Sequence, residues 1–267
     1  VVNLFYGFLT GSNNIPDTFN GDRVTSSLQK SWHAIFGFEL DLSNRLNLNI
    51  EGYLKDFTQI TNINRNKVYD DNVTNSDKPD YLKKDLIIES GKAYGVDFLL
   101  KYDSKQLYLW LVYSLGWVDR FDGIITYSPH FDRRHNINFV GTYKFGKDLS
   151  WNFSARWNFG SGFPFTPTAG YYEQMPFFTN LNLPYWQSNG NLGIIYGDIN
   201  SARLPDYHRF DINLQKTISF SERVKMEIVL SCTNVYNRDN IFYFDRVDHE
   251  RVNQLPIMPS IGMSLTF

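Results

Sequence analysis

The chain has 267 residues, of which 42% are hydrophobic and 17% aromatic, and its 26 Lys and Arg against 28 Asp and Glu give a formal net charge of −2. This near-neutral balance gives no sign of nucleic-acid binding, and the single cysteine, Cys232, excludes an internal disulfide and a cysteine-based metal cluster. No apolar run reaches the roughly 18 residues that a membrane helix needs, which argues against a helical membrane protein but not against a β-barrel, whose strands are apolar only at every second residue.

Alternation of apolar and polar residues with a period of two predicts ten strands. In chain order they are expected at about 1–9, 31–42, 46–55, 91–102, 106–119, 135–145, 149–160, 207–220, 224–236 and 257–267. The hairpin of the second and third strands is the clearest, since Phe36 and Phe38 share one face while Glu39 and Asp41 share the other. The last strand ends on Phe267, and an alternating strand that ends on an aromatic residue is typical of the closing strand of an outer-membrane barrel.

Short and long connections alternate strictly between these strands. Turns of two or three residues begin at Ser43, Asp103, Gly146 and Ser221, whereas the other connections, about 10–30, 58–90, 120–134, 161–206 and 237–256, are long. Outer-membrane barrels place short turns on the periplasmic side and long loops outside. A soluble β-sandwich is the alternative for any one strand, but it has no reason to sort its loops in this way.

Aromatic residues of the apolar face gather at the ends of the predicted strands. One ring is expected at the periplasmic interface and consists of Tyr102, Phe145, Phe220 and Phe267. A second ring is expected at the outer interface and consists of Trp32, Trp117, Trp157 and Tyr236. Lys216 lies deeper on the same face, so either its side chain reaches an interface or the register shifts there. The sequence therefore predicts an all-β fold, a transmembrane antiparallel up-and-down β-barrel segment.

Five segments together resemble the C-terminal half of a TonB-dependent receptor of the Bacteroidetes type. They are residues 89–98, 131–138, 155–165, 204–211 and 233–238. The resemblance implies a receptor of the cell outer membrane that binds an extracellular ligand on its long loops and imports it through a plugged barrel. It implies the lipid bilayer, the protein's own plug domain and TonB as partners, and it allows an accessory surface lipoprotein as a further one.

Ten strands are fewer than the 22 of that family's barrel. A ten-stranded sheet cut from a wider barrel exposes two unpaired edges to lipid, which is not viable alone. We therefore expect residues 1–267 to be the C-terminal part of a barrel domain, with the plug domain and the N-terminal strands outside this chain. Val1 begins an apolar run and not a signal peptide, which agrees with the removal of residues upstream.

No motif points to catalysis, to a cofactor or to a metal. The histidines, His33, His130, His135, His208 and His249, lack metal-ligand spacing, and no nucleophile elbow, phosphate loop or dinucleotide fingerprint is present. The alternative function is a self-contained ten-strand, omptin-like protease of the outer membrane. Its best pair is Asp206 with His208, which share a strand face, although hydrogen bonding at the barrel rim explains them more simply.

The second long loop is rich in acidic and amide side chains, which could supply oxygen ligands to calcium: Asp70, Asp71, Asn72, Asp77 and Asp80. Their spacing does not match an EF-hand, so we interpret them as solvated loop charge.

The fourth long loop, residues 161–206, is the best candidate for ligand binding because it carries nine aromatic residues among several prolines. The predicted ligand contacts are five aromatic residues of this loop and two arginines that face the lumen by parity: Phe163, Phe165, Tyr171, Tyr172, Trp186, Arg156 and Arg209. The alternatives are that the aromatic residues pack loop against loop and that the arginines contact the plug.

Overall fold

The structure is a computed structural model that describes residues 18–19, 21–24, 28–173, 192–221, 224–246 and 250–267. The predicted strand at 1–9 and the predicted ligand residue Trp186 lie outside these residues. The chain divides into two compact units. The first unit consists of Val1–Gly37, Glu51–Val96 and Gly116–Asp132, and the second unit of Phe38–Ile50, Asp97–Leu115 and Arg133–Phe267.

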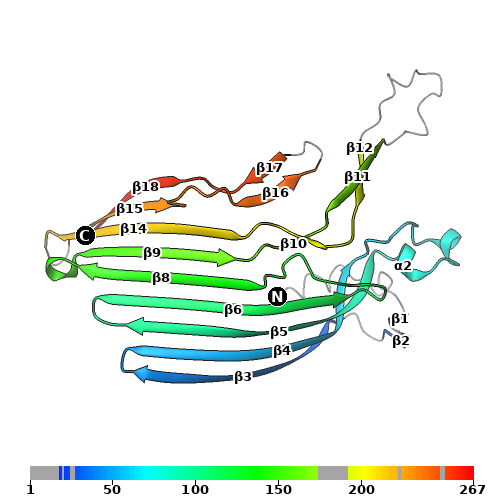
Figure 1. Ribbon diagram of the computed structural model, residues 1–267, viewed down its shortest axis with the longest axis horizontal. Helices are drawn as coiled ribbons and strands as arrows, with labels where there is room; N and C mark the ends of the chain where they lie inside the picture. Colours follow the sequence, from blue (N-terminus) through cyan, green and yellow to red (C-terminus); the bar gives the residue numbers. More distant parts are fainter. Residues whose placement is uncertain (1–17, 20, 25–27, 174–191, 222–223, 247–249) are drawn as a thin grey trace, which may run out of the picture. The chain divides into compact units, whose positions relative to one another are not determined.

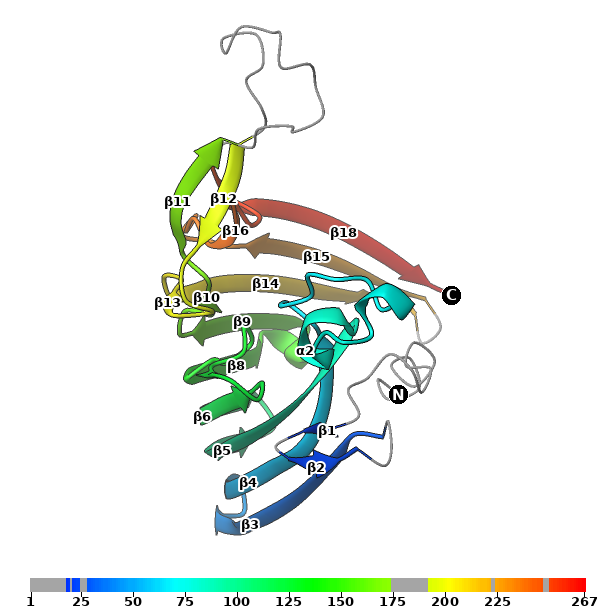
Figure 2. The same ribbon diagram turned by 90° about the vertical axis from the view of Figure 1, so that its right-hand side faces the viewer.

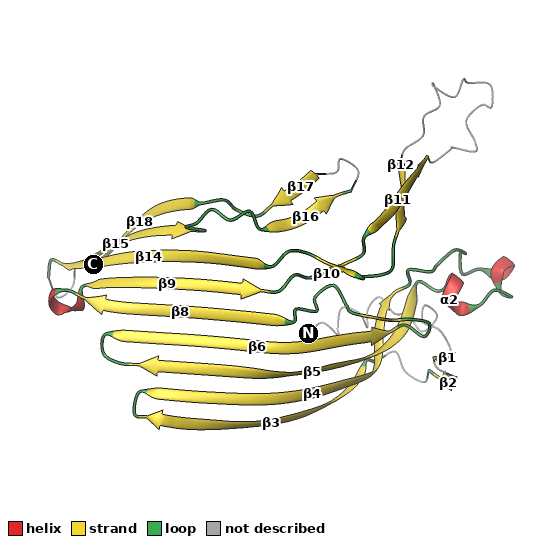
Figure 3. Cartoon of the chain, in the orientation of Figure 1, coloured by secondary structure: helices red, strands yellow, loops and turns green. Residues whose placement is uncertain are grey.

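Long antiparallel strands make up most of the regular structure, as Figure 3 shows. Along the chain they are β3 (Lys30–Ser43), β4 (Leu46–Ile63), β5 (Leu86–Asp103), β6 (Leu107–Phe121), β8 (His135–Phe145), β9 (Trp151–Gly160), β14 (Tyr207–Ser219), β15 (Lys225–Thr233) and β18 (Met258–Thr266). Their order in the sheet is β18-β15-β14-β9-β8-β6-β5-β4-β3, and the short β7 (Thr126–Tyr127) pairs with β6. This up-and-down order confirms the predicted all-β, antiparallel fold class, with nine of the ten predicted strands in place.

The short connections and the C-terminus lie at one end of the second unit (Figure 1). There β3 passes to β4, β5 to β6, β8 to β9 through η2 (Lys147–Leu149), and β14 to β15. The long connections of this unit leave the opposite end. The predicted sorting of turns and loops is therefore confirmed in the second unit.

The register of the second unit keeps apolar residues opposite apolar residues. One continuous row contains the directly opposed pairs Leu111–Phe139, Phe139–Trp157, Trp157–Phe210, Leu214–Leu230 and Leu230–Ile261. The other face pairs polar residues, among them Asn138 with Asn158 and Arg156 with Asp211. Because a slip of one residue would move every side chain to the other face, this register fixes the two-face pattern that the alternation predicted.

Lys216 stays on the apolar row without a register shift. It lies opposite Trp151, and its neighbour Leu214 lies opposite Phe153, so the pairing is unbroken. The Lys216 Nζ donates to Ser150 Oγ at 2.7 Å and lies 4.8 Å from the centre of the Trp151 ring. Of the two interpretations of this lysine, the structure supports a side chain that reaches along the strand toward the turn.

Two strands extend further into the second long loop than the alternation predicted. β4 continues to Ile63 and β5 begins at Leu86, and the added residues contain most of the buried apolar residues of the first unit. Ile60, Ile87 and Ile88 are 8%, 4% and 2% exposed. Consecutive apolar residues that are buried on both faces break the period of two, so these ends lacked the signal that marked the rest of each strand.

The loops of both units contain short elements that the sequence analysis did not predict. In the first unit these are β1 (Thr18–Phe19), β2 (Asp22–Arg23), η1 (Val73–Asn75) and α2 (Asp80–Lys83). Figure 2 labels β1, β2 and α2. In the second unit β10 (Pro164–Phe165) pairs with β13 (Ala202–Arg203), β11 (Thr168–Glu173) with β12 (Leu192–Tyr196), and β16 (Ile241–Asp245) with β17 (Glu250–Asn253). None of the helices in the described part of the chain has the length and apolar character needed to cross a membrane.

Candidate functional site

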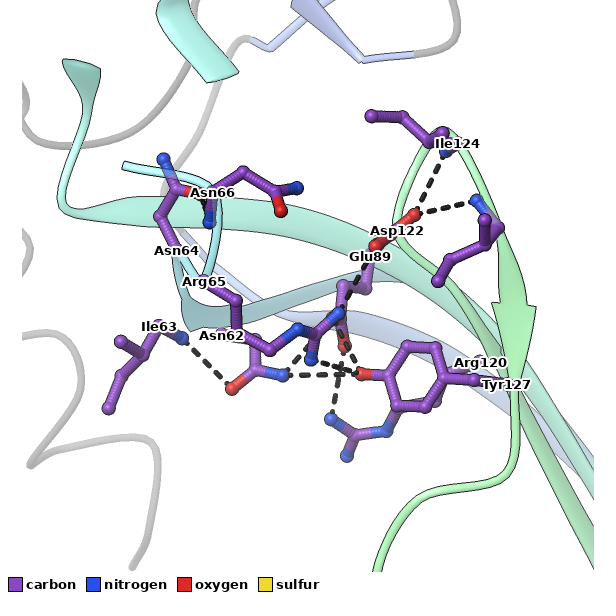
Figure 4. Close-up of polar contacts among 11 residues, drawn as sticks. Asn62, Ile63, Asn64, Arg65, Asn66, Glu89, Arg120, Asp122, Ile124 and Tyr127 are labelled. Atoms are coloured by element: carbon purple, nitrogen blue, oxygen red, sulfur yellow. Dashed lines mark hydrogen bonds and ion pairs between the residues drawn. The ribbon is translucent and has the colours of Figure 1, made fainter. Parts of the chain in front are cut away.

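A fully buried carboxylate organises the loop end of the first unit. Glu89 on β5 is 0% exposed, and four side chains donate to it (Figure 4). Tyr127 Oη and Asn62 Nδ2 donate to Glu89 Oε1 at 2.7 and 3.1 Å. Arg65 reaches the same oxygen at 3.4 Å, and Arg120 reaches Oε2 at 3.2 Å. Two cations and two neutral donors thus compensate the cost of removing the carboxylate from water.

Arg65 extends this cluster to the turn that follows β6. Its guanidinium pairs with Asp122 at 3.1 Å and lies 4.6 Å from the centre of the Tyr127 ring. Asp122 Oδ1 in turn accepts the amides of Ile124 and Ile125, each at 2.9 Å. One cluster therefore fixes the end of β4, β5 and the turn between β6 and β7.

The electrostatics keep this cluster in its paired state. Burial acts to lower the pKa of Arg65, but the hydrogen bond to Tyr127 and the charges of Glu89 and Asp122 outweigh it, so the pKa is raised. Burial is also the main cause of the raised pKa of Tyr127, which keeps its phenol protonated as a donor. Every polar group of Glu89 has partners within the protein, so we assign the Glu89 cluster a role in holding the loops and not in binding a ligand.

A pocket of about 510 Å³ lies among the loops of the second unit, next to the end of β9 and the start of β14. We call it the arginine pocket. The residues of its wall that matter here are Arg133, Phe163, Asp206, Tyr207, Arg238 and Phe242. Only Phe163 among them was predicted to contact a ligand.

Arg133 lies flat against the wall of this pocket. Its guanidinium carbon is 4.0 Å from the centre of the Phe163 ring and 5.7 Å from that of Tyr207. A Cβ added to Gly160 would overlap this guanidinium, so the absence of a side chain at Gly160 is what lets the cation lie on the strand. Burial lowers the pKa of Arg133, because removal from water disfavours the charged form.

A second cavity, of about 490 Å³, adjoins the first and is lined by aromatic residues. We call it the aromatic cleft; Leu204 and Phe242 line both cavities. Phe165 lies against Phe244 with their ring centres 6.2 Å apart, and Tyr171 Oη donates to the Arg246 carbonyl at 3.0 Å. These contacts join the loop 161–206 to the loop 237–256.

The structure brings only some of the predicted ligand residues together. Phe163 lines the arginine pocket, and Phe165 and Tyr171 line the aromatic cleft. Tyr172 is 50% exposed on β11 and lines neither cavity. As ligand contacts, all of these residues stay predictions.

The two predicted arginines lie away from both cavities, on the polar face of the strands. Arg209 forms an ion pair with Asp211 at 3.0 Å, and Arg156 lies opposite Asp211 on the neighbouring strand. The sequence analysis missed Arg133, Arg238 and Phe242. The aromatic run at 242–244 in the fifth loop was the one signal that could have drawn attention to that loop.

The proposed protease pair, Asp206 and His208, is engaged elsewhere. Asp206 Oδ1 accepts the amide of Gly162 at 3.0 Å, and His208 Nδ1 lies 2.7 Å from the hydroxyl of Tyr236. A catalytic histidine needs an orienting partner and a nucleophile or water within reach. The observed hydrogen bonds instead match the interpretation of both residues as rim hydrogen-bonding groups.

Three of the acidic residues named in the second long loop pair with lysines. Asp71 contacts Lys84 at 2.9 Å, Asp77 contacts Lys78, and Asp80 contacts Lys83. The hydrogen bond from Lys84 is the main cause of the lowered pKa of Asp71. Within the described ranges, no group of three or more His, Cys, Asp or Glu side chains is placed to hold a metal ion.

Solved structures that share this fold include outer-membrane transporters and receptors. The chain matches the ferric citrate transporter FecA in its unliganded form with a TM-score of 0.57 and 11% identity, over 90% of this chain and 31% of that one. It matches the ferripyoverdine receptor of the outer membrane of Pseudomonas aeruginosa with a TM-score of 0.54 and 10% identity, over 89% and 27%. It matches the outer membrane transporter YddB from Escherichia coli with a TM-score of 0.55 and 8% identity, over 90% and 33%.

At such low identity these matches establish the fold alone. The chain spans about a third of the length of these transporters or less. No protein-family model matches the chain, and no curated protein sequence matches it. Its fold is that of a portion of an outer-membrane transporter barrel.

Close packing at Gly162 gives a direct test of the loop structure. A Cβ at Gly162 would overlap the backbone carbonyl of Leu204, which cannot rotate away as a side chain could. We expect Gly162→Ala to separate β10 from β13 and to destabilise the loop by about 1–3 kcal/mol, seen as faster proteolysis of loop 161–206. Gly170→Ala is the matched control, since its Cβ would meet nothing closer than 3.9 Å. Equal proteolysis of the two variants would contradict the observed packing.

Proposed function

We propose that the chain is the C-terminal part of the barrel of a TonB-dependent outer-membrane receptor of the Bacteroidetes type, which binds an extracellular ligand and imports it through a plugged barrel. The observation that carries the proposal is the match in fold to FecA over 90% of this chain. The five sequence segments that resemble this receptor family support it independently of the fold.

Energetics also support a membrane location. In the second unit the apolar row continues across β6, β8, β9, β14, β15 and β18, and it includes large residues that are exposed, such as Tyr143, Phe153 and Leu230 at 46%, 38% and 47%. A continuous exposed apolar surface of this kind is stable in contact with hydrocarbon and is a liability in water.

The remaining partners follow from the proposed family. A plug domain and the N-terminal strands belong to the same polypeptide, and TonB supplies energy through the plug. The long loops bind the extracellular ligand, with Phe163, Phe165, Tyr171, Tyr172, Trp186, Arg156 and Arg209 as proposed contacts, and an accessory surface lipoprotein acts at the same side. No cofactor and no enzymatic step form part of the proposal.

Fractionation of cells that express the complete polypeptide tests the proposal. We expect the protein in the outer membrane, resistant to extraction by urea, and faster in electrophoresis before heating than after heating, because a closed barrel keeps its strands paired in detergent. Recovery in the soluble fraction, or the same mobility before and after heating, would refute a membrane barrel. In a second arm, the isolated periplasmic domain of TonB should be retained by the complete polypeptide and not by a variant that lacks its plug domain.

A further inference from the structure

We propose that the arginine pocket of the second unit binds an oxyanion, a carboxylate, phosphate or sulfate group, of a soluble organic ligand. The inference rests on the proposed function, since it names the chemical class of what the long loops would bind. It follows from two arginines of the pocket whose buried Nε–H donors have no acceptor among the described residues.

Arg133 provides the first half of the evidence. Its side chain makes no hydrogen bond or ion pair with any described residue, and its buried Nε has no partner. An arginine carries five N–H donors in a fixed planar fork, and a buried donor without an acceptor destabilises the fold. Stacking on Phe163 and Tyr207 offsets part of this cost but satisfies none of the donors. A bound oxyanion would satisfy them.

Arg238 provides the second half, from another loop. One of its terminal nitrogens donates to the Asp206 carbonyl at 2.9 Å, while its buried Nε has no partner among the described residues. Arg238 and Arg133 line the same pocket. Two guanidinium groups with unused donors are a common arrangement for binding a carboxylate or phosphate.

Neither aspartate of the pocket forms an ion pair with Arg133 or Arg238. Asp239 is paired with Arg251 at 3.4 Å, and Asp206 Oδ1 accepts the Gly162 amide. No ion pair within 4.0 Å joins Arg133 or Arg238 to a carboxylate in the described part of the chain. The wall of the pocket carries three arginines, Arg133, Arg238 and Arg251, against two aspartates, so its formal charge is +1.

The aromatic cleft indicates that the ligand is larger than a simple ion. Leu204 and Phe242 form part of both cavities, so a ligand held by its anionic group at Arg133 can extend along Phe242 toward Phe165 and Tyr171. Aromatic walls favour the flat apolar face of an organic group or of a sugar ring.

The test measures anion binding to the complete polypeptide purified in a neutral detergent. The probes are inorganic phosphate, sulfate and citrate, each titrated at constant ionic strength against chloride, with binding followed by calorimetry. We expect saturable binding of at least one probe, and a loss of affinity of about tenfold or more in Arg133→Gln, because hydrogen bonds between a guanidinium and an oxyanion are charge-assisted and stronger than neutral ones. Arg45→Gln, in the short turn between β3 and β4, removes the same charge far from the pocket and should bind like the parent protein.

A second variant guards against misfolding of Arg133→Gln. Gly160→Ala leaves every charge in place but adds a methyl group where the Arg133 guanidinium lies, so it should also weaken anion binding. Unchanged affinity in both variants, or an equal loss in Arg45→Gln, would overturn the inference while leaving the proposed receptor function intact. Arg133-dependent binding of phospholipid micelles alone, with no binding of the soluble probes, would overturn the assignment to a soluble ligand.

Discussion

Replacing Glu89 with alanine is expected to destabilise the loop end of the first unit by about 3 kcal/mol. The change removes the acceptor of four donors and leaves Arg120, whose side chain is 20% exposed, with its Glu89 ion pair gone. Removing one partner of a buried ion pair typically costs about 3–5 kcal/mol, and the partial exposure of Arg65 at 33% places the value at the lower end. Asp122 still pairs with Arg65, so local opening is expected and not loss of the whole sheet.

Hydrogen exchange measured by mass spectrometry checks this prediction. Amides in residues 60–66, 86–90 and 120–127 should exchange on the order of a hundredfold faster, the factor that corresponds to about 3 kcal/mol. Glu51→Gln is the control in the same unit, because the Glu51 side chain has no hydrogen bond or ion pair with the described residues. Unchanged protection in Glu89→Ala would mean that the cluster does not hold these loops.

Placing an arginine on the apolar row is expected to impair folding into a membrane by about 2–4 kcal/mol near the midplane of the bilayer. Leu109 is the clearest position, since it lies opposite Gly141 on β8, in the same row as Leu111. Leu48 occupies the predicted apolar face of β4, so Leu48→Arg should have a similar effect. Asn49 has the opposite parity, and Asn49→Arg should leave folding nearly unchanged.

The measurement is the free energy of unfolding of the complete polypeptide in lipid vesicles, obtained from denaturant titrations. The comparison of Leu48→Arg with Asn49→Arg is internally controlled, because both add one positive charge to adjacent residues of one strand. If all three variants lost the same stability, the assignment of one face to lipid and the other to the lumen would be wrong.

The strands and the sorting of their connections could be predicted from the sequence because both signals are local. Successive side chains of a strand face opposite sides of the sheet, so apolar and polar residues alternate where the two sides have different environments. Residues 135–145 show this alternation, and their predicted bounds match those of β8. Of the ligand residues predicted in the fourth loop, Phe163, Phe165 and Tyr171 line cavities in the structure, and their role in binding stays a prediction.

What lay beyond the sequence depends on contacts between distant residues. The position of Lys216 was decided only by the register of β14 against β9, because a periodic pattern alone permits a slip. The Glu89 cluster joins residues 62, 65, 89, 120 and 127, and its strand ends are buried on both sides, which removes the alternation that would have marked them.

The arginine pocket also depends on contacts between residues that are distant in the sequence. Arg133 lies against Gly160, Phe163 and Tyr207. The spacing of these residues along the sequence matches no recognisable motif. The sequence by itself determined where most of each long strand lies, how apolar and polar residues alternate along it and where the long loops lie, because the environment on each side of a sheet selects residues one position at a time. Only the tertiary structure decided which loop residues meet and which cations stay unpaired, because pairing is a property of two or more residues brought together by the fold.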